Sequence, residues 1–147
     1  MYELEAVIGE PHVLARAGEW VALPHDLALL PVTGDWLAKV AEGPHTFRRP
    51  APGVRKLLAG CSMVAPVAHV EAGFFGGDGG QAARIYRDGI VVYEADVLEL
   101  TGPPGEWPIN QALTMLGLDP RPGEDLFDEL HLGRHRHTED WLGPRER

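Results

Sequence analysis

The sequence contains a single cysteine, Cys61, among its 147 residues. One cysteine can form neither an internal disulfide nor a cysteine-based zinc site, which excludes a disulfide-stapled secreted scaffold. Positive charge is also scarce, because 13 Lys and Arg face 22 Asp and Glu and leave a formal net charge of −9. A general nucleic-acid-binding surface needs an excess of positive charge, so we expect no nucleic-acid partner.

A basic leader and a long apolar run are missing as well. The first five residues, MYELE, are acidic where a secretory signal is basic, and the longest uncharged stretch, 57–70, contains Gly60 and Pro66. A helix that spans a bilayer needs about 20 mostly apolar residues. The sequence therefore predicts no membrane association and a cytoplasmic protein.

The bulk composition is that of a folded globular protein, with 44% hydrophobic and 24% charged residues. The length fits one domain, and we expect a single domain over residues 1–147. The stretch 44–53 (PHTFRRPAPG) is the most linker-like part of the chain and indicates an internal linker. A short basic run lies in and after this stretch, and we interpret it as solvated: Arg48, Arg49, Arg55 and Lys56.

Apolar periodicity predicts strands in the first and middle parts of the chain. Alternation over 2–8 indicates a half-buried strand with its acids in water, and the apolar residues of 13–17 indicate a returning partner strand. Two short apolar runs, 20–23 and 27–32, predict further strands. The clearest pattern, over 64–97, predicts a three-strand antiparallel meander with a hairpin turn at Asp88-Gly89.

Helices are indicated between and after these strands. Thr33 is placed as an N-cap and Gly43-Pro44 as the stop of one helix, and a shorter helix is predicted over 54–59. Pro108 opens the most regular helix, which ends at Gly117. Together these patterns predict an α+β fold, in which an antiparallel sheet is packed by a few short helices.

The glycine-rich stretch 76–81 formally fits a dinucleotide-binding fingerprint, but the residues after it alternate like a strand rather than forming a helix. We therefore interpret it as a connection between strands that needs positive φ at several positions, with a ligand- or partner-contacting loop as the alternative.

Two groups of residues could carry chemistry. The C-terminal residues His131, His135, His137 and Asp140 are candidate metal ligands, although Gly133 interrupts a helix there and the neighbouring arginines oppose a cation. His69 and Glu71 leave the same face of a strand. They are candidates for a proton-transfer pair or for a cross-strand network with Arg84 or Tyr86. Neither group calls for a cofactor, and we expect none.

Three segments together carry a resemblance over about residues 64–141. They read HVEAGFFGGDGGQA from His69, INQALTMLG from Ile109 and LGRHRHTEDW from Leu132, with Gly80 as a small departure in the first. The set resembles a group of small bacterial proteins, some of which are similar to immunity proteins that neutralise toxins. The resemblance implies a cytoplasmic protein that acts by binding.

We therefore expect a non-enzymatic binding protein of the immunity or inhibitor kind, whose acidic surface meets a basic protein partner. The expected contact residues are Phe74, Phe75, Gly77, Gly79, Gln81, Asp125, Asp128 and Glu129. Two alternatives stay open, namely a small metal-dependent hydrolase that uses the C-terminal histidines, and a homodimeric structural module.

Overall fold

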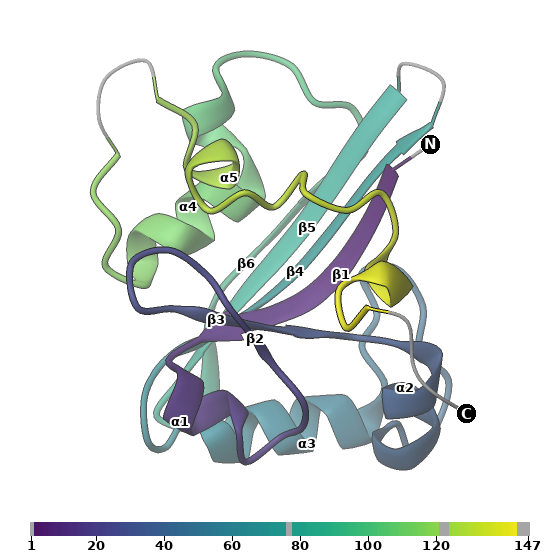
Figure 1. The fold of residues 1–147 in the computed structure, drawn as a ribbon. Helices are drawn as coiled ribbons and strands as arrows, with labels where there is room; N and C mark the ends of the chain where they lie inside the picture. The colour runs from purple at the N-terminus through teal and green to yellow at the C-terminus, as the bar shows by residue number, and fades with distance from the viewer. Residues whose placement is uncertain (1, 76–77, 121–123, 144–147) are drawn as a thin grey trace.

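The computed structural model describes residues 2–75, 78–120 and 124–143, with the side chains of Phe74, Phe75 and Asp78 left out. These residues form a six-stranded antiparallel sheet with the strand order β2-β3-β1-β4-β5-β6 (Figure 1). The strands are β1 (Tyr2–Gly9), β2 (Val21–Ala22), β3 (Ala28–Pro31), β4 (Val67–Phe75), β5 (Asp78–Arg87) and β6 (Ile90–Val97).

Helices cover the sheet on both faces, and each face has its own apolar core. One face, called the α3 face here, packs against α1 (Pro11–Leu14), α2 (Gly34–Val40) and α3 (Pro52–Cys61). The opposite face, the α4 face, packs against α4 (Pro108–Met115), α5 (Leu126–Glu129) and the chain that follows. Two 3₁₀ turns, η1 (Pro104–Glu106) and η2 (Thr138–Asp140), complete the elements. The central strands are therefore buried on both sides.

The predicted α+β class is confirmed, and so is the meander, which is formed by β4, β5 and β6. Thr33 is the N-cap of α2, since its Oγ1 accepts a hydrogen bond from the Trp36 N–H at 3.1 Å. The predicted helix after Pro108 is α4, and the short helix predicted over 54–59 is the longer α3.

The prediction of a returning strand over 13–17 is wrong. Pro11 occupies the first turn of the helix α1, where its fixed φ favours helical geometry and its missing N–H costs nothing. Val13 and Leu14 are buried in the core of the α3 face. The partners of β1 are instead β3 and β4, which come from more distant parts of the sequence.

In the part of the chain that the structure describes, no helix combines the length and the apolar character that crossing a membrane requires. The longest helix is α3, with 10 residues. It packs against the sheet through Val54, Leu58 and Cys61, and burial raises the pKa of the Cys61 thiol. This cysteine behaves as a small apolar core residue.

Two glycines of α3 give a matched test of its packing. A Cβ on Gly53 would lie 1.8 Å from the carbonyl oxygen of Val40 in α2, whereas a Cβ on Gly60 would meet nothing within 4 Å. Gly53→Ala should therefore lower the free energy of unfolding by about 3 kcal/mol or more, because two backbones must separate. Gly60→Ala should raise it by up to about 1 kcal/mol through helix propensity. Urea denaturation measures both, and equal stabilities would contradict this account of the contact between α2 and α3.

Candidate functional site

Polar side chains occupy neighbouring positions on the α3 face, beyond the part of the sheet that the helices cover. Successive side chains of a strand alternate between faces, so the strand registers determine which residues share this face. Two rows run across β1, β4, β5 and β6 in the register of the sheet: Val7, His69, Arg84 and Glu94, and next to it Glu5, Glu71, Ala82 and Asp96. The second row thus places two carboxylates on adjacent strands.

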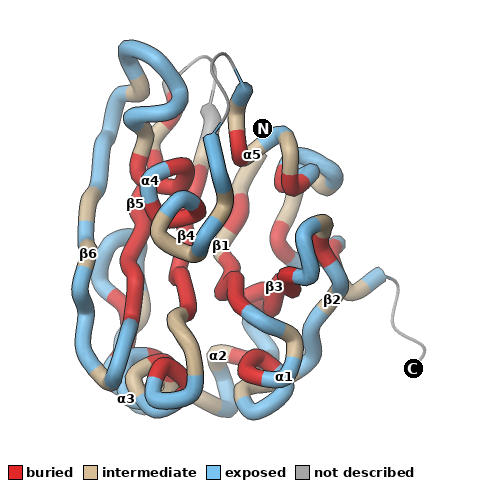
Figure 2. The backbone as a smooth tube through the Cα atoms, turned by 90° about the vertical axis from the view of Figure 1, so that its left-hand side faces the viewer, coloured by how far each residue is buried: buried red, intermediate tan, exposed pale blue. Residues whose placement is uncertain are grey.

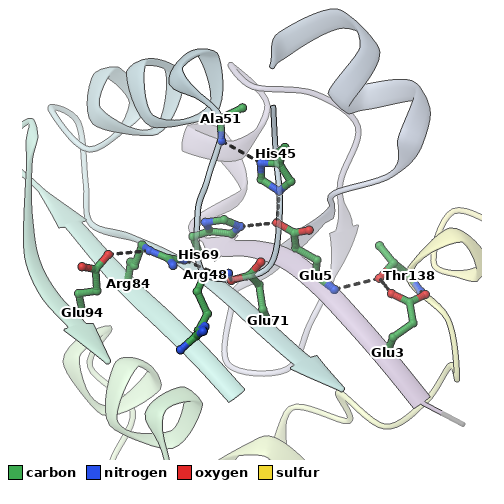
Figure 3. A network of polar contacts seen from close by, with 10 residues as sticks. All are labelled: Glu3, Glu5, His45, Arg48, Ala51, His69, Glu71, Arg84, Glu94 and Thr138. Atoms are coloured by element: carbon green, nitrogen blue, oxygen red, sulfur yellow. Dashed lines mark hydrogen bonds and ion pairs between the residues drawn. The ribbon is translucent and has the colours of Figure 1, made fainter. Parts of the chain in front are cut away.

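The stretch 44–51 crosses over these rows (Figure 3). It was interpreted as part of a linker, but it packs on the sheet through His45 and through the backbone N–H of Arg48, which donates to Glu71 at 3.2 Å. Thr46 and Arg49 close a tight turn, within which Arg48 has φ +67°. Positive φ is costly for a side-chain-bearing residue and often marks a constrained functional segment. The Arg48 side chain is exposed, as expected for the basic run, and it also forms an ion pair with the equally exposed Asp96 at 3.1 Å.

Glu5 is the centre of the network. Its Oε2 lies 2.6 Å from Nε2 of His45 and 2.7 Å from Nε2 of His69. Burial alone would raise the pKa of Glu5, but the hydrogen bonds from the two imidazoles outweigh it and lower the pKa to about 2. Glu5 is therefore an ionised carboxylate at neutral pH, held in place from two sides.

The backbone of Ala51 determines the tautomer of His45. Its N–H donates to Nδ1 of His45 at 3.0 Å, so this nitrogen carries no proton and Nε2–H donates to Glu5. The hydrogen bond with Glu5 raises the pKa of His45. A second proton, on Nδ1, would nevertheless face the Ala51 N–H, and the folded geometry therefore favours the neutral ring. Nδ1 of His69 is fully buried and has no hydrogen-bond partner within the described residues.

Glu71 is the second carboxylate, and its environment is the opposite of that of Glu5. Burial raises the pKa of Glu71, and the nearby charge of Glu5 adds to this effect. Arg84 partly offsets it, with Nη1 3.3 Å from Glu71 and Nε 2.8 Å from the exposed Glu94. The predicted cross-strand network with Arg84 is thus present for Glu71, and both side chains are buried.

The same residues have a composition that suits a metal ion. Glu5, His45, His69 and Glu71 each offer a ligand atom, and these atoms lie within 4.8 Å of one another. Around a tetrahedral ion with bonds of about 2.1 Å, ligand atoms lie about 3.4 Å apart, so contacts of 2.6 and 2.7 Å are hydrogen bonds. Nε2 of His45 could bind an ion only if Nδ1 took the proton and lost its bond from Ala51. The geometry fits a hydrogen-bonded network.

A cavity of about 370 Å³ adjoins this network. Its lining combines three carboxylate residues with apolar residues and glycines: Glu3, Leu4, Glu5, Phe47, Glu71, Ala72, Gly73, Gly79, Gly80 and Leu98. Gly73 and Gly80 are paired across β4 and β5. They continue the positions of Glu71 and Ala82 on the α3 face. Because both lack a side chain, the sheet leaves a hollow there.

The surroundings of the cavity carry an excess of negative charge. The carboxylates of the cavity and the network are Glu3, Glu5, Glu71, Glu94 and Asp96, and the guanidinium groups are those of Arg48 and Arg84. With all of these groups ionised, five negative charges face two positive ones. A site of this kind attracts a cation and repels an anion.

The structure does not bring the C-terminal candidates together. His135 packs edge-on against Trp141 with ring centroids 5.0 Å apart, and Nδ1 of His137 lies 3.8 Å from Glu3. His131 and Asp140 are exposed. Within residues 2–75, 78–120 and 124–143, the only group of three or more potential ligands is the one around Glu5.

Most of the expected contact residues do not form an open surface. Gln81 is buried, and its Oε1 accepts a hydrogen bond from the Ile109 N–H, so it anchors α4 to β5. Asp125 is the N-cap of α5 and Glu129 contacts His25, whereas Asp128 is exposed.

The remaining expected contacts belong to the β4–β5 hairpin. Phe74 and Phe75 continue β4, where they pair with Gly79 and Asp78 of β5, while Gly77 lies outside the described residues. The prediction of positive φ at several glycines of this stretch does not hold for Gly79 and Gly80, which are strand residues. A Cβ on Gly80 would lie 3.1 Å from the carbonyl oxygen of Val97, so close packing against β6 also requires a glycine there.

Sequence reasoning missed Glu5 and His45 as site residues. Glu5 was expected in water, whereas its side chain is only 19% exposed. The sequence did contain a signal that Glu5 is not simply solvated. Val7 shares the strand face of Glu5 but is apolar, and in the structure it is fully buried. His45 lies in the stretch expected to be a linker, and no local pattern indicates that it contacts a residue 40 positions earlier.

Comparisons with protein-family models, curated proteins and solved structures find no match for this chain. The resemblance to immunity proteins therefore remains an expectation from the sequence.

Proposed function

We propose that this chain is a non-enzymatic binding protein that takes a cationic side chain, from Lys or Arg of a basic protein partner, into the cavity on the α3 face. The observation that carries this proposal is the cavity lining, in which Glu3, Glu5 and Glu71 meet apolar walls. The partner class is that expected from the acidic composition, with a net charge of −9. Complementary charge of this kind speeds association and orients the partner.

The cavity suits both parts of a long cationic side chain, namely its aliphatic stem and its charged end. The aliphatic stem of Lys or Arg packs well against apolar surface while its charged end meets carboxylates, and Phe47 and Leu98 supply that surface. Glu5 offers a fixed, ionised carboxylate at neutral pH because two imidazoles hold it. Oε2 of Glu5 already accepts from both imidazoles, so the charged end of either side chain would donate to Oε1 of this carboxylate.

One observation favours a second function, acid–base catalysis. Glu5 and Glu71 have ligand atoms within 4.8 Å of each other, and their pKa values are shifted in opposite directions. Such a pair can divide the roles of base and acid. His69, the imidazole of the expected proton-transfer pair, is however fully buried and does not line the cavity. Binding therefore accounts for more of the geometry.

The proposal is tested with a single residue as ligand. Nα-acetyl-arginine amide is titrated into ¹⁵N-labelled protein, and its citrulline analogue, which has nearly the same shape and no charge, serves as control. We expect saturable amide shifts at Ala72, Gly79 and Gly80, with a Kd in the millimolar range, which corresponds to about 4 kcal/mol. Citrulline should bind at least about fivefold more weakly, because one ion pair in a partly buried site contributes about 1 kcal/mol or more.

A cavity-filling variant provides the matched protein control. Gly73→Val adds a side chain on the lining and should abolish the arginine-dependent shifts. Gly60→Ala, on the outer side of α3, should leave them unchanged. Equal binding of arginine and citrulline amides, or shifts that persist in Gly73→Val, would contradict the proposal.

A further inference from the structure

The edge strand β6 presents an unpaired backbone. It is the last strand of the sheet and pairs only with β5. Among the described residues, no backbone hydrogen bond reaches its outer side. The opposite edge, β2, has only two residues, whereas β6 has eight. Natural proteins usually keep edge strands short or covered, since an open edge is a template for another strand.

The side chains of β6 are unusually apolar for an exposed edge. Most residues of the strand are exposed (Figure 2). The large apolar residues among them, together with the residue that follows the strand, are Ile90, Val91, Val92, Val97 and Leu98, with Ile90 and Leu98 more than 60% exposed. Such a group of exposed apolar residues along one edge is typical of an interaction surface rather than of solvent-facing sheet.

We infer that β6 is the docking strand for an extended segment of the basic partner, which adds to the sheet as a seventh strand and carries basic residues on the α3 face and apolar residues on the α4 face. The inference rests on the proposed function, because the basic character of the partner is taken from it. Addition of a strand to a sheet edge is a general mode of peptide recognition, in which the backbone supplies affinity and alternate side chains supply specificity.

The expected pattern of the partner segment follows from the register of β6. Glu94 and Asp96 share the α3 face, opposite Arg84 and Ala82 of β5, while Tyr93 shares the α4 face with Ile85. A seventh strand would lie about 4.8 Å from β6, with directly opposed Cβ atoms about 5 Å apart. Basic side chains opposite the two acids therefore reach them.

The edge also leads to the cavity. Leu98 follows β6 directly and is one of the residues that line the cavity. Glu99, the next residue, is exposed and adds another negative charge. A basic side chain beyond the position of Asp96 on the added strand would stand beside Leu98, at the entrance of the cavity. One segment of the partner can therefore use the edge and the cavity together.

A second copy of this chain fits the same edge less well. A two-fold axis perpendicular to the sheet would pair β6 with itself in antiparallel orientation. In the register centred on Glu94, this residue faces its own copy, and in the register centred on Ala95 it faces Asp96. Like charges directly opposite each other destabilise a strand pair, and each copy carries a net charge of −9. These two registers are therefore disfavoured, and in any register the net charge of each copy favours a basic strand over self-association.

The test uses an end-blocked peptide of four Lys-Val repeats and amide hydrogen exchange of the full chain. We expect slower exchange for the outward amides of β6 and no change for β2 and β3. Two peptide controls separate the contributions to binding. A Glu-Val peptide of the same length keeps the backbone and reverses the charge, and a Lys-Val peptide N-methylated at alternate residues keeps the charge and loses backbone donors. Neither should protect β6.

A protein variant addresses the acids directly. Glu94→Gln with Asp96→Asn should weaken the Lys-Val peptide about threefold or more, since two exposed ion pairs are lost. The control variant, Asp119→Asn with Glu124→Gln, changes the net charge equally at exposed positions away from β6 and should bind normally. Urea denaturation of both variants verifies that each is folded.

The outcomes separate this inference from the proposed function. Binding of arginine amide without protection of β6 by the peptide would overturn the docking strand and leave the cavity proposal standing. Protection of β6 by the peptide without binding of arginine amide would overturn the cavity proposal and leave the docking strand standing. A doubled solution mass with β6 already protected in the absence of peptide would also overturn the inference, because a second copy would then occupy the edge.

Discussion

Replacing Glu5 with glutamine is expected to lower the free energy of unfolding by about 2–4 kcal/mol at pH 7. The reason is that His45 and His69 both direct Nε2 at one oxygen of Glu5. The amide oxygen of glutamine can take the place of this oxygen, but it accepts both hydrogen bonds without a charge. A hydrogen bond to a charged group contributes about 1 kcal/mol more than a neutral one, and two such bonds are weakened here. The residual exposure of Glu5 keeps the expected loss below that of a fully buried ion pair.

The effect of Glu5→Gln should depend on pH with a definite sign. The folded-state pKa of Glu5 is about 2, below its ordinary value of 4.5. A carboxyl whose pKa is lowered by folding contributes stability that is complete above the unfolded pKa and is lost as the pH falls toward the folded pKa. The difference in unfolding free energy between the wild type and Glu5→Gln should therefore shrink between pH 4.5 and pH 2.

Urea denaturation at a series of pH values measures this difference. Glu124→Gln, at an exposed position, is the control and should follow the wild-type curve. A Glu5→Gln variant as stable as the wild type at pH 7, or a difference that does not change with pH over this range, would show that the two imidazoles do not stabilise the Glu5 carboxylate.

Replacing Arg84 with methionine is expected to destabilise the chain by about 3–5 kcal/mol, the largest loss among these predictions. Arg84 is 2% exposed and lies between Glu71 and Glu94. Without its charge, the buried carboxylate of Glu71 stands next to that of Glu5 with no cation in contact. Removing one partner of a buried ion pair leaves an uncompensated charge, which costs more than the pair itself contributes.

A second substitution distinguishes this cause from lost packing. Adding Glu71→Leu to Arg84→Met removes the uncompensated charge, so the double variant should recover half or more of the stability that Arg84→Met loses. The single Arg84→Met variant should also become relatively more stable as the pH falls, because burial raises the pKa of Glu71 and the protonated form costs less. A double variant less stable than Arg84→Met would falsify this explanation and point to the packing of the arginine stem.

Local patterns predicted the elements whose apolar period is clear or whose ends are marked by a turn or capping residue. The alternation over 64–97 with Asp88-Gly89 at its turn gave the meander, and Thr33 gave the start of α2. The error at 13–17 arose because a four-residue helix is too short to show a helical period. Periodicity cannot separate such a helix from a short strand.

The site was only half predictable, for a related reason. His69 and Glu71 lie two apart in one strand, so their common face follows from the strand period, and Arg84 follows from the hairpin register. Glu5 and His45 come from β1 and from the stretch 44–51, whose positions depend on the pairing of β1 with β4 and on a turn with positive φ at Arg48. No spacing within the sequence encodes those long-range contacts.

The sequence by itself determined the composition class, the excess of negative charge, the α+β pattern and the pairing of β4, β5 and β6. These properties depend on residue counts and on interactions between neighbours in the chain. The tertiary structure alone decided that both faces of the sheet are covered, that two imidazoles hold Glu5, and that the glycines of β4 and β5 leave a cavity. The physical reason is that burial and hydrogen bonding between distant segments, rather than local propensity, determine which polar groups lose water and which charges meet.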